Sequence, residues 1–300
     1  MSSDLRISAR TAYLLMTLTA LFWAGNFVVG RAATGTIPPL TLACARWVGA
    51  SLMILPFAAA KLNADWTEIR RNAGFLFLLG CIGAGLFNTL QYVSLTMMTA
   101  VTGAVINSAG PVLIAIACWL ILGDRLRALQ MLGIALSLGG VLIVVMRGDL
   151  GRMPALGQSI GELLMLMALT VWAVYTALLR FRPPMHPLSF ATATYVVAAL
   201  VNIPPMIWEL THGATLPLDA ATFLAFAYVA IFPGLLAYLF FNMAVDSIGG
   251  ARASAFFHLT PLMTATLALV FLGEAFALYH VVGFALIIAG VWLTATRAAR

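Results

Sequence analysis

Apolar residues run along most of the chain in long stretches that few charged residues interrupt. Residues 73–123 contain no Asp, Glu, Lys, Arg or His over 51 consecutive positions. A helix that crosses a bilayer needs about 20 mainly apolar residues, so this run is long enough for two. A membrane β-barrel would instead show segments of about ten residues with alternating polarity, a pattern that the apolar runs lack. The pattern therefore predicts membrane-spanning helices.

Ten such segments can be drawn along the chain, each close to the length of one span. The 51-residue run is divided around residues 96–99. The segments are roughly 11–30, 40–60, 73–95, 100–122, 128–146, 160–179, 187–208, 220–244, 253–273 and 276–296. We therefore predict an all-α integral membrane protein with ten transmembrane helices, whose loops are too short to form a soluble domain.

The chain also resembles itself at an offset of about 150 residues. The matched positions are Trp23 with Trp172, Arg31 with Arg180, Pro111 with Pro261, Gly133 with Gly283, and Gly140 with Gly290. Because each half holds five predicted helices, an odd number, the second half must enter the membrane in the opposite sense. We predict two inverted five-helix repeats, residues 1–148 and 149–300. Transporters built this way have a central site near the midplane, which alternating access exposes to either side.

Composition and charge support the membrane assignment and set the orientation. The chain is 63% apolar and 9% charged, with a mean hydropathy of +1.03, whereas about 25% of residues in soluble domains are charged. With a cytoplasmic N-terminus, twelve of the sixteen Lys and Arg residues fall on the cytoplasmic side, as the positive-inside rule requires. Both termini are therefore predicted to be cytoplasmic. The net charge of +6 reflects this asymmetry and includes no basic nucleic-acid motif, so nucleic acid is not an expected partner.

Prolines interrupt matching helices in both halves. Pro111 and Pro261 each lie about ten residues into a predicted span, which at ~1.5 Å per residue is near the midplane. Gly110 precedes the first, and Pro233 and Gly234 stand together in the span 220–244. Broken helices at corresponding positions are a pointer to a transporter site, although a kink that serves packing is the alternative. We treat these five residues as candidate hinges.

Polar and aromatic side chains at similar depth are the candidate substrate-binding residues, because polar groups that face lipid are costly. Spacings of three and four place Asn88, Gln91 and Tyr92 on one helix face. The full set is Trp23, Asn26, Arg46, Asn88, Gln91, Tyr92, Asn107, Trp172, Tyr175, Tyr238, Asn242 and His258. Together they predict a chamber with aromatic walls and amide groups, which suits small amphipathic solutes. For each residue alone, a hydrogen bond between helices is the alternative.

Charge and titration narrow the roles within this set. Arg46 lies about seven residues into its span, where it could attract a substrate carboxylate or extend outward to the membrane surface. Arg31 is nearer the surface and is expected to be an interfacial anchor. His258 could relay protons, bind the solute or be a core histidine, and no carboxylate is placed as deep. Because proton-driven transporters usually have intramembrane carboxylates, we expect facilitated diffusion or a weak dependence on protons.

Several motifs resemble those of a known transporter family over nearly the whole chain. They are LFWAGN at 21–26, NSAGP at 107–111 with LGDR at 122–125, and the second copy HLTP at 258–261 with LGE at 272–274. The chain is thereby similar to the drug/metabolite transporter superfamily, and most similar to its ten-helix EamA-type branch of bacterial metabolite and amino-acid exporters. The resemblance implies a 5+5 inverted bundle in the bacterial cytoplasmic (inner) membrane that exports small metabolites. Asp124 stands where the family often has Glu.

The resulting prediction is an exporter of small amphipathic metabolites, with neutral and aromatic amino acids as the expected substrates. The lipid bilayer and the solute are the expected partners, no cofactor or metal is expected, and the protein is expected to act as a monomer. A multidrug or nucleotide-sugar transporter of the same fold is the alternative. The phosphates of a nucleotide-sugar need several cations, however, and Arg46 is the only cation that the sequence places deep in the membrane. An enzyme is not expected, because the four histidines are scattered. A structural membrane protein is the non-transporter alternative.

Overall fold

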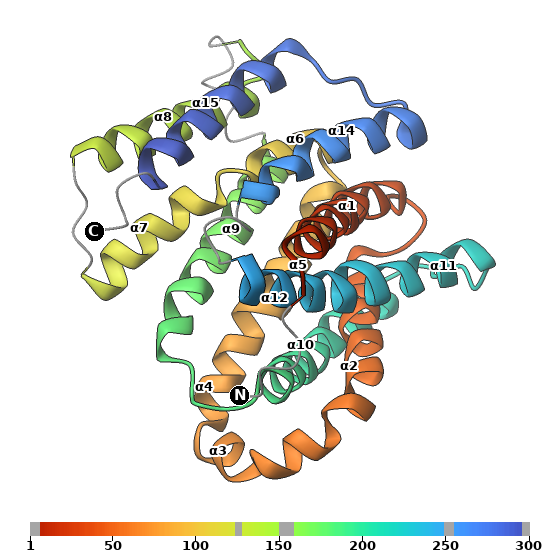
Figure 1. Ribbon diagram of the computed structural model, residues 1–300. Coiled ribbons are helices and arrows are strands. Elements are labelled where there is room, and N and C mark those ends of the chain that lie inside the picture. The colour runs from red at the N-terminus through yellow and green to blue at the C-terminus, as the bar shows by residue number, and fades with distance from the viewer. Residues whose placement is uncertain (1–6, 124–127, 150–158, 249–254, 296–300) are drawn as a thin grey trace.

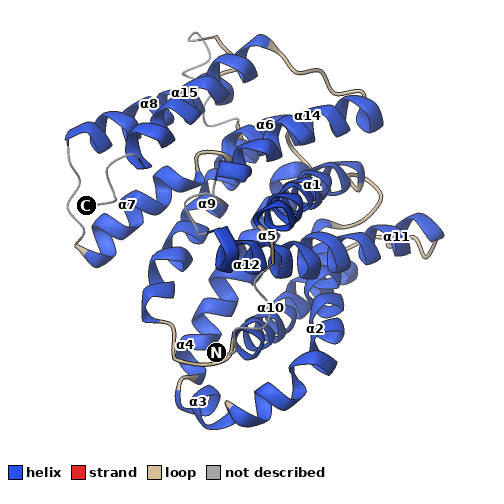
Figure 2. Cartoon of the chain, in the orientation of Figure 1, coloured by secondary structure: helices blue, strands red, loops and turns tan. Residues whose placement is uncertain are grey.

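Helices make up the secondary structure of the computed structural model, which describes residues 7–123, 128–149, 159–248 and 255–295. None of these residues is in a strand (Figure 2). The first half contains α1 (Ala9–Ala32), α2 (Pro39–Ala64), α3 (Trp66–Arg71), α4 (Ala73–Leu79), η1 (Gly80–Leu86), α5 (Phe87–Leu95), α6 (Ala100–Asn107), α7 (Gly110–Leu122) and α8 (Ala128–Val145). The second contains α9 (Ile160–Leu178), η3 (Leu179–Phe181), α10 (Pro187–Thr211), α11 (Ala220–Val229), η4 (Ala230–Leu236), α12 (Ala237–Ile248), η5 (Ala255–His258), α14 (Leu259–Leu272) and α15 (Leu278–Ala295).

The lengths and the apolar surfaces of these helices confirm an all-α membrane fold. In the described part of the chain, seven helical segments are long and apolar enough to cross a bilayer, and α6 with α7 forms an eighth that is bent by 41°. Large apolar side chains such as Phe57 and Phe271 are more than 70% exposed, which is expected of a surface that faces lipid. Two further apolar helices, Leu259–Leu272 and Leu278–Leu293, are shorter than a usual span. The exact count of ten spans therefore stays a prediction.

Both halves contain a π-helical segment at the same place in the repeat. In the first half η1 joins α4 to α5, and 150 residues later η4 joins α11 to α12. The packing is matched as well, because η1 lies against α10 and η4 lies against α2. Such segments are rare and occur mostly at functional sites. Their recurrence at the offset seen in the sequence supports two structurally related halves.

The α8 and α15 helices form a close antiparallel pair (Figure 1). Gly140 meets the backbone of Gly283, and Gly290 meets the backbone of Gly133. In the repeat, Gly133 corresponds to Gly283 and Gly140 corresponds to Gly290. The two contacts are therefore equivalent to each other under the 150-residue offset. This equivalence is what a pseudo-two-fold axis between the helices would produce, as an inverted repeat predicts. The predicted boundary at 148 and 149 lies beside residues 150–158, which are outside the described part.

Carboxylates hold the second pair of equivalent helices, α2 and α10, at both of their ends. Glu209, near the end of α10, accepts hydrogen bonds from the backbone N–H groups of Leu40 at 3.2 Å and Thr41 at 2.8 Å, where α2 begins. Asp65, just after α2, accepts one from the N–H of His186 at 2.8 Å, just before α10. The first N–H groups of a helix have no partner within the helix, so each carboxylate satisfies the start of the opposite helix.

Candidate substrate-binding site

A buried polar network surrounds Arg46, whose side chain is only 2% exposed. Its Nη1 donates to Asn26 Oδ1 at 2.8 Å and to the Tyr92 hydroxyl at 3.3 Å. Its Nη2 donates to the carbonyl of Pro233 at 3.1 Å. The alternative in which Arg46 extends to the membrane surface is therefore wrong, because these acceptors hold the guanidinium inside the bundle.

The network joins four elements and both halves of the chain. Tyr92 donates to Asn26 Oδ1 at 2.6 Å, and Asn26 Nδ2 donates to Gln91 Oε1 at 3.3 Å. These side chains come from α1 and α5, Arg46 comes from α2, and the carbonyl of Pro233 comes from η4 in the second half. Four residues that the sequence singled out thus converge, and a predicted hinge residue supplies the fifth group.

The electrostatics of Arg46 are unusual for a buried cation. In the described part of the chain, the hydrogen-bond partners of Arg46 are neutral. The ion pair in that part joins Arg31 to Glu274 and does not involve Arg46. The Nε of Arg46 is buried and has no hydrogen-bond acceptor in that part of the chain, and its guanidinium carbon lies 5.1 Å from the centre of the Trp47 ring. A buried charge without a counter-ion is costly. An anion such as a carboxylate, which guanidinium groups bind in a bidentate manner, would offset this cost.

The predicted aromatic residues form two groups of neighbouring rings. Trp23 and Tyr238 have ring centres 6.1 Å apart, and Tyr238 lies 5.9 Å from Tyr195. On α9, the ring of Trp172 lies 5.1 Å from that of Tyr175 and 5.0 Å from that of Phe87. The four rings that the sequence predicted, those of Trp23, Trp172, Tyr175 and Tyr238, are partly rather than fully buried. They therefore keep surface that a solute could stack on.

Two aromatic residues of this region were not among those that the sequence singled out. Trp47 follows Arg46 directly and is completely buried, and its ring lies 4.9 Å from that of Tyr195. Tyr195 stands 149 residues after Arg46, so the repeat offset that paired Trp23 with Trp172 would have found it. Trp47 has no comparable signal, because one tryptophan in an apolar helix is as easily placed at the membrane interface.

The candidate hinges lie where helices change their geometry. Asn107 ends α6, and α7 begins at Gly110 with Pro111 in its first turn, across the bend of 41°. Pro261 lies in the first turn of α14, directly after the 3₁₀ segment η5 that ends at His258. Pro233 and Gly234 both lie inside η4. Each predicted break is thus a real change of helix geometry, while movement about it stays a prediction.

The remaining predicted residues are less closely connected. Asn88 is 1% exposed and donates to the carbonyl of Ala84 at 3.1 Å, and its Oδ1 has no donor among the described residues. His258 is partly buried, and its Nδ1 likewise has no partner in the described part. Asn242 lies in α12, but its side chain is outside what the structure describes. No three His, Cys, Asp or Glu side chains of the described residues form a group that could hold a metal.

A second polar cluster joins the two halves at the predicted outer side. Arg31, at the end of α1, forms an ion pair of 3.5 Å with Glu274, which follows α14, and it donates to the carbonyl of Leu95 at 3.0 Å. Glu274 in turn accepts from the backbone N–H groups of Ala100 at 3.1 Å and Val101 at 3.2 Å, where α6 begins. Arg31 is therefore not merely an interfacial anchor, because it ties α1 to α14 and, through Glu274, to α6.

Removing this tie is expected to open the outer side. Glu274→Ala should raise the labelling of Val105→Cys, a residue of α6 that is completely buried, by a membrane-impermeant maleimide at least threefold. The test requires a background in which Cys44, Cys81 and Cys118 are serine.

Glu209→Ala is the matched control for the same labelling assay. Each variant loses a helix cap worth about 1 kcal/mol, but Glu209 holds α2 within the closely packed α2–α10 pair. Equal labelling in the two variants would contradict a specific role for the Arg31–Glu274 tie.

Comparisons with known proteins agree with this architecture. The model of the EamA-like transporter family matches residues 10–146 and 159–296. An uncharacterized transporter of Bacillus subtilis, YyaM, is 30% identical, over 95% of this chain and 93% of its own length. A probable terminal-alkyne amino-acid exporter of Streptantibioticus cattleyicolor is 24% identical, over 93% of this chain and 91% of its own. A solved crystal structure with 20% identity covers 96% of this chain and 99% of that one, with a TM-score of 0.65, and so shares the fold.

Proposed function

Since the chain belongs to the EamA-like transporter family and is a multi-pass membrane protein, we propose that it exports small amphipathic metabolites, specifically neutral and aromatic amino acids. Members of this family are transporters, so the membrane setting and a small-molecule substrate follow from membership. The substrate class, the direction and the residues that bind the solute are the proposal. The similarity to a probable terminal-alkyne amino-acid exporter from Streptantibioticus cattleyicolor supports it.

The proposal rests on the buried charge of Arg46, which has no counter-ion in the described part of the chain. A substrate carboxylate would supply the missing counter-ion and an acceptor for the buried Nε, with charge-assisted hydrogen bonds worth about 1.5–3 kcal/mol each. Asn88 Oδ1 is a buried acceptor that could receive a hydrogen bond from an α-ammonium group. The nearby rings of Trp23 and Tyr238 would favour the same cation through their π faces. A nucleotide-sugar would need several such cations, and Arg46 is the deep one among the described residues.

Alternating access would expose this site to one side of the membrane at a time. The polar network already joins the two halves through the carbonyl of Pro233, so a shift of η4 would alter the acceptors of Arg46. The Arg31–Glu274 tie would keep the outer side closed in this conformation. Because no carboxylate contacts Arg46 among the described residues, we propose transport by facilitated diffusion with little dependence on a proton gradient.

Uptake of labelled amino acids into liposomes tests this function. We expect saturable flux of leucine, phenylalanine and tryptophan, changed less than twofold by a pH gradient. In Trp172→Ala, phenylalanine flux should fall about two- to twelvefold, because a lost aromatic contact costs about 0.5–1.5 kcal/mol. Trp66→Ala, at a tryptophan that is 56% exposed in α3, is the matched control and should leave flux unchanged. Absence of flux for all amino acids with folded protein would overturn the proposed substrate class.

A further inference from the structure

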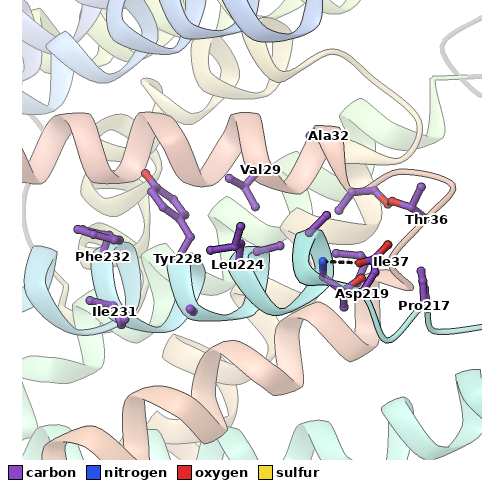
Figure 3. A pocket seen from close by; sticks show the side chains of 15 residues that line it. Val29, Ala32, Thr36, Ile37, Pro217, Asp219, Leu224, Tyr228, Ile231 and Phe232 are labelled. Carbon is purple, nitrogen blue, oxygen red and sulfur yellow. Dashed lines mark hydrogen bonds between the residues drawn. The ribbon is translucent and has the colours of Figure 1, made fainter.

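An apolar groove of about 640 Å³ opens between α1 and α11 at the predicted outer side. Figure 3 shows Val29 on α1 and Leu224 on α11 facing one another across it, with Phe232 of η4 beyond them. Leu224 is 70% exposed, so the groove is open along its side, in the part of the bundle that faces lipid. Its volume falls in the range of small-molecule sites, about 300–1,000 Å³.

Tyr228 lines the groove between Leu224 and Phe232, and its side chain reaches toward α1 (Figure 3). Its hydroxyl donates to the carbonyl of Phe22 on α1 at 3.3 Å. The hydroxyl lies directly against Gly25, where any Cβ would clash with it. Gly25 precedes Asn26 of the polar network, and Phe232, which also lines the groove, precedes Pro233, whose carbonyl accepts a hydrogen bond from Arg46. On both α1 and η4, the contacts of the groove therefore lie one residue away from the polar network.

We propose that this groove is a lateral extension of the substrate site, which holds the apolar end of a solute whose carboxylate is bound by Arg46. The inference rests on the proposed function and adds a substrate class to it: carboxylates with a long aryl or alkyl tail. Movement of the Tyr228 hydroxyl away from Gly25 would join the groove to the polar network. The tail would then lie between Val29 and Leu224, partly in contact with the bilayer.

The charges at the two ends of the groove fix the orientation of its occupant. Asp219 stands at the mouth, and the N–H of Thr222 donates to its carboxylate at 2.8 Å. This hydrogen bond holds the pKa of Asp219 below its usual range, so the mouth is negatively charged at neutral pH. An anionic head group is repelled there, whereas Arg46, whose Nε has no acceptor among the described residues, attracts one. These charges disfavour an anionic phospholipid whose head lies at the membrane surface, and they favour a solute with its anion pointing inward.

Narrowing the groove should change substrate preference according to tail length. We expect Leu224→Trp to lower the flux of phenylalanine and tryptophan into liposomes at least fivefold while that of alanine changes less than twofold. Phe223→Trp is the matched control, because Phe223 is the neighbouring residue on α11, is 56% exposed and does not line the groove. It should leave all three fluxes unchanged. Val29→Phe narrows the groove from the α1 side and should likewise lower phenylalanine and tryptophan flux relative to alanine flux. It replaces Leu224→Trp in the test if that variant does not fold.

Each outcome separates this inference from the proposed function. If wild-type protein moves neither alanine nor phenylalanine, the proposed function fails and the inference fails with it. If wild-type protein moves both, but Leu224→Trp and Val29→Phe leave the ratio of phenylalanine to alanine flux within twofold of wild type, the groove holds lipid only. The inference is then wrong, and the function stands. Alanine flux close to wild type in a variant also shows that the variant is folded.

Discussion

Replacing Arg46 by methionine is expected to lower amino-acid flux about ten- to 150-fold without lowering thermal stability. The loss follows from charge-assisted hydrogen bonds to the carboxylate, worth about 1.5–3 kcal/mol, at 1.4 kcal/mol per tenfold. Stability should be unchanged or higher, because the substitution removes a 2% exposed cation that has no counter-ion among the described residues. The Tyr92–Asn26 hydrogen bond of 2.6 Å is independent of Arg46. Flux in liposomes and the melting temperature in detergent measure the two effects.

Two further variants show whether the effect belongs to this site. Arg46→Lys keeps the charge but loses the planar, bidentate geometry, so it should retain part of the flux. Arg31→Met removes the arginine at the predicted outer side and leaves Glu274 without its ion pair, so it should lower the melting temperature. If Arg46→Met instead transported normally and melted several degrees lower, Arg46 would be a structural residue and the proposed site would be wrong.

Replacing one glycine of the α8–α15 pair by alanine is expected to destabilise the protein strongly. In Gly140→Ala, the new Cβ would lie 2.6 Å from the carbonyl oxygen of Gly283 and 3.0 Å from the backbone nitrogen of Ile287. Neither atom can rotate away, so the two helices must separate. Overpacking of this kind costs about 1–3 kcal/mol, and small residues at close helix contacts are a main source of membrane helix association.

The adjacent glycine provides a matched control for this substitution. A Cβ at Gly139 would meet no atom within 4 Å, so Gly139→Ala should gain the helix propensity of alanine, about 0.5–1 kcal/mol. Reversible unfolding of both variants in detergent measures the difference in free energy of unfolding. Equal stabilities would show that the α8–α15 contact is looser than described and would weaken the argument for a pseudo-two-fold axis there.

The main helices could be predicted because the physical signal is strong over many residues. A span must bury about 20 residues in hydrocarbon, and seven helical segments of the described part, with the bent pair α6 and α7 as an eighth, are long and apolar enough to do so. The short helix α3 and the π segments η1 and η4 could not be foreseen, because their hydrogen-bond patterns depend on packing against neighbouring helices. Pro233 and Gly234 marked the position of η4, but η1 contains three glycines and no proline. The number of spans is still set by the sequence pattern alone.

The sequence could predict several residues of the polar network, but not the contacts between distant helices. The cost of polar groups in lipid pointed to Asn26, Arg46, Gln91 and Tyr92, which do converge, and whether they bind the solute stays a prediction. The roles of Glu274 and Tyr228 were missed, because one lies in a loop and the other resembles a lipid-facing tyrosine. Their contacts, with Arg31 and with Gly25, arise from how helices distant in sequence are packed, which hydrophobic periodicity does not encode.

Whether Arg46 binds the substrate carboxylate is tested by comparing the binding of phenylalanine with that of phenylalaninamide, which lacks the carboxylate. Purified wild-type protein should prefer phenylalanine at least about tenfold, and Arg46→Met should bind the two within about twofold, because the preference comes from charge-assisted hydrogen bonds to the guanidinium. Such a coupling would place the substrate carboxylate at Arg46. If both proteins preferred phenylalanine to the same degree, the carboxylate would be bound elsewhere and the account of the site would be wrong.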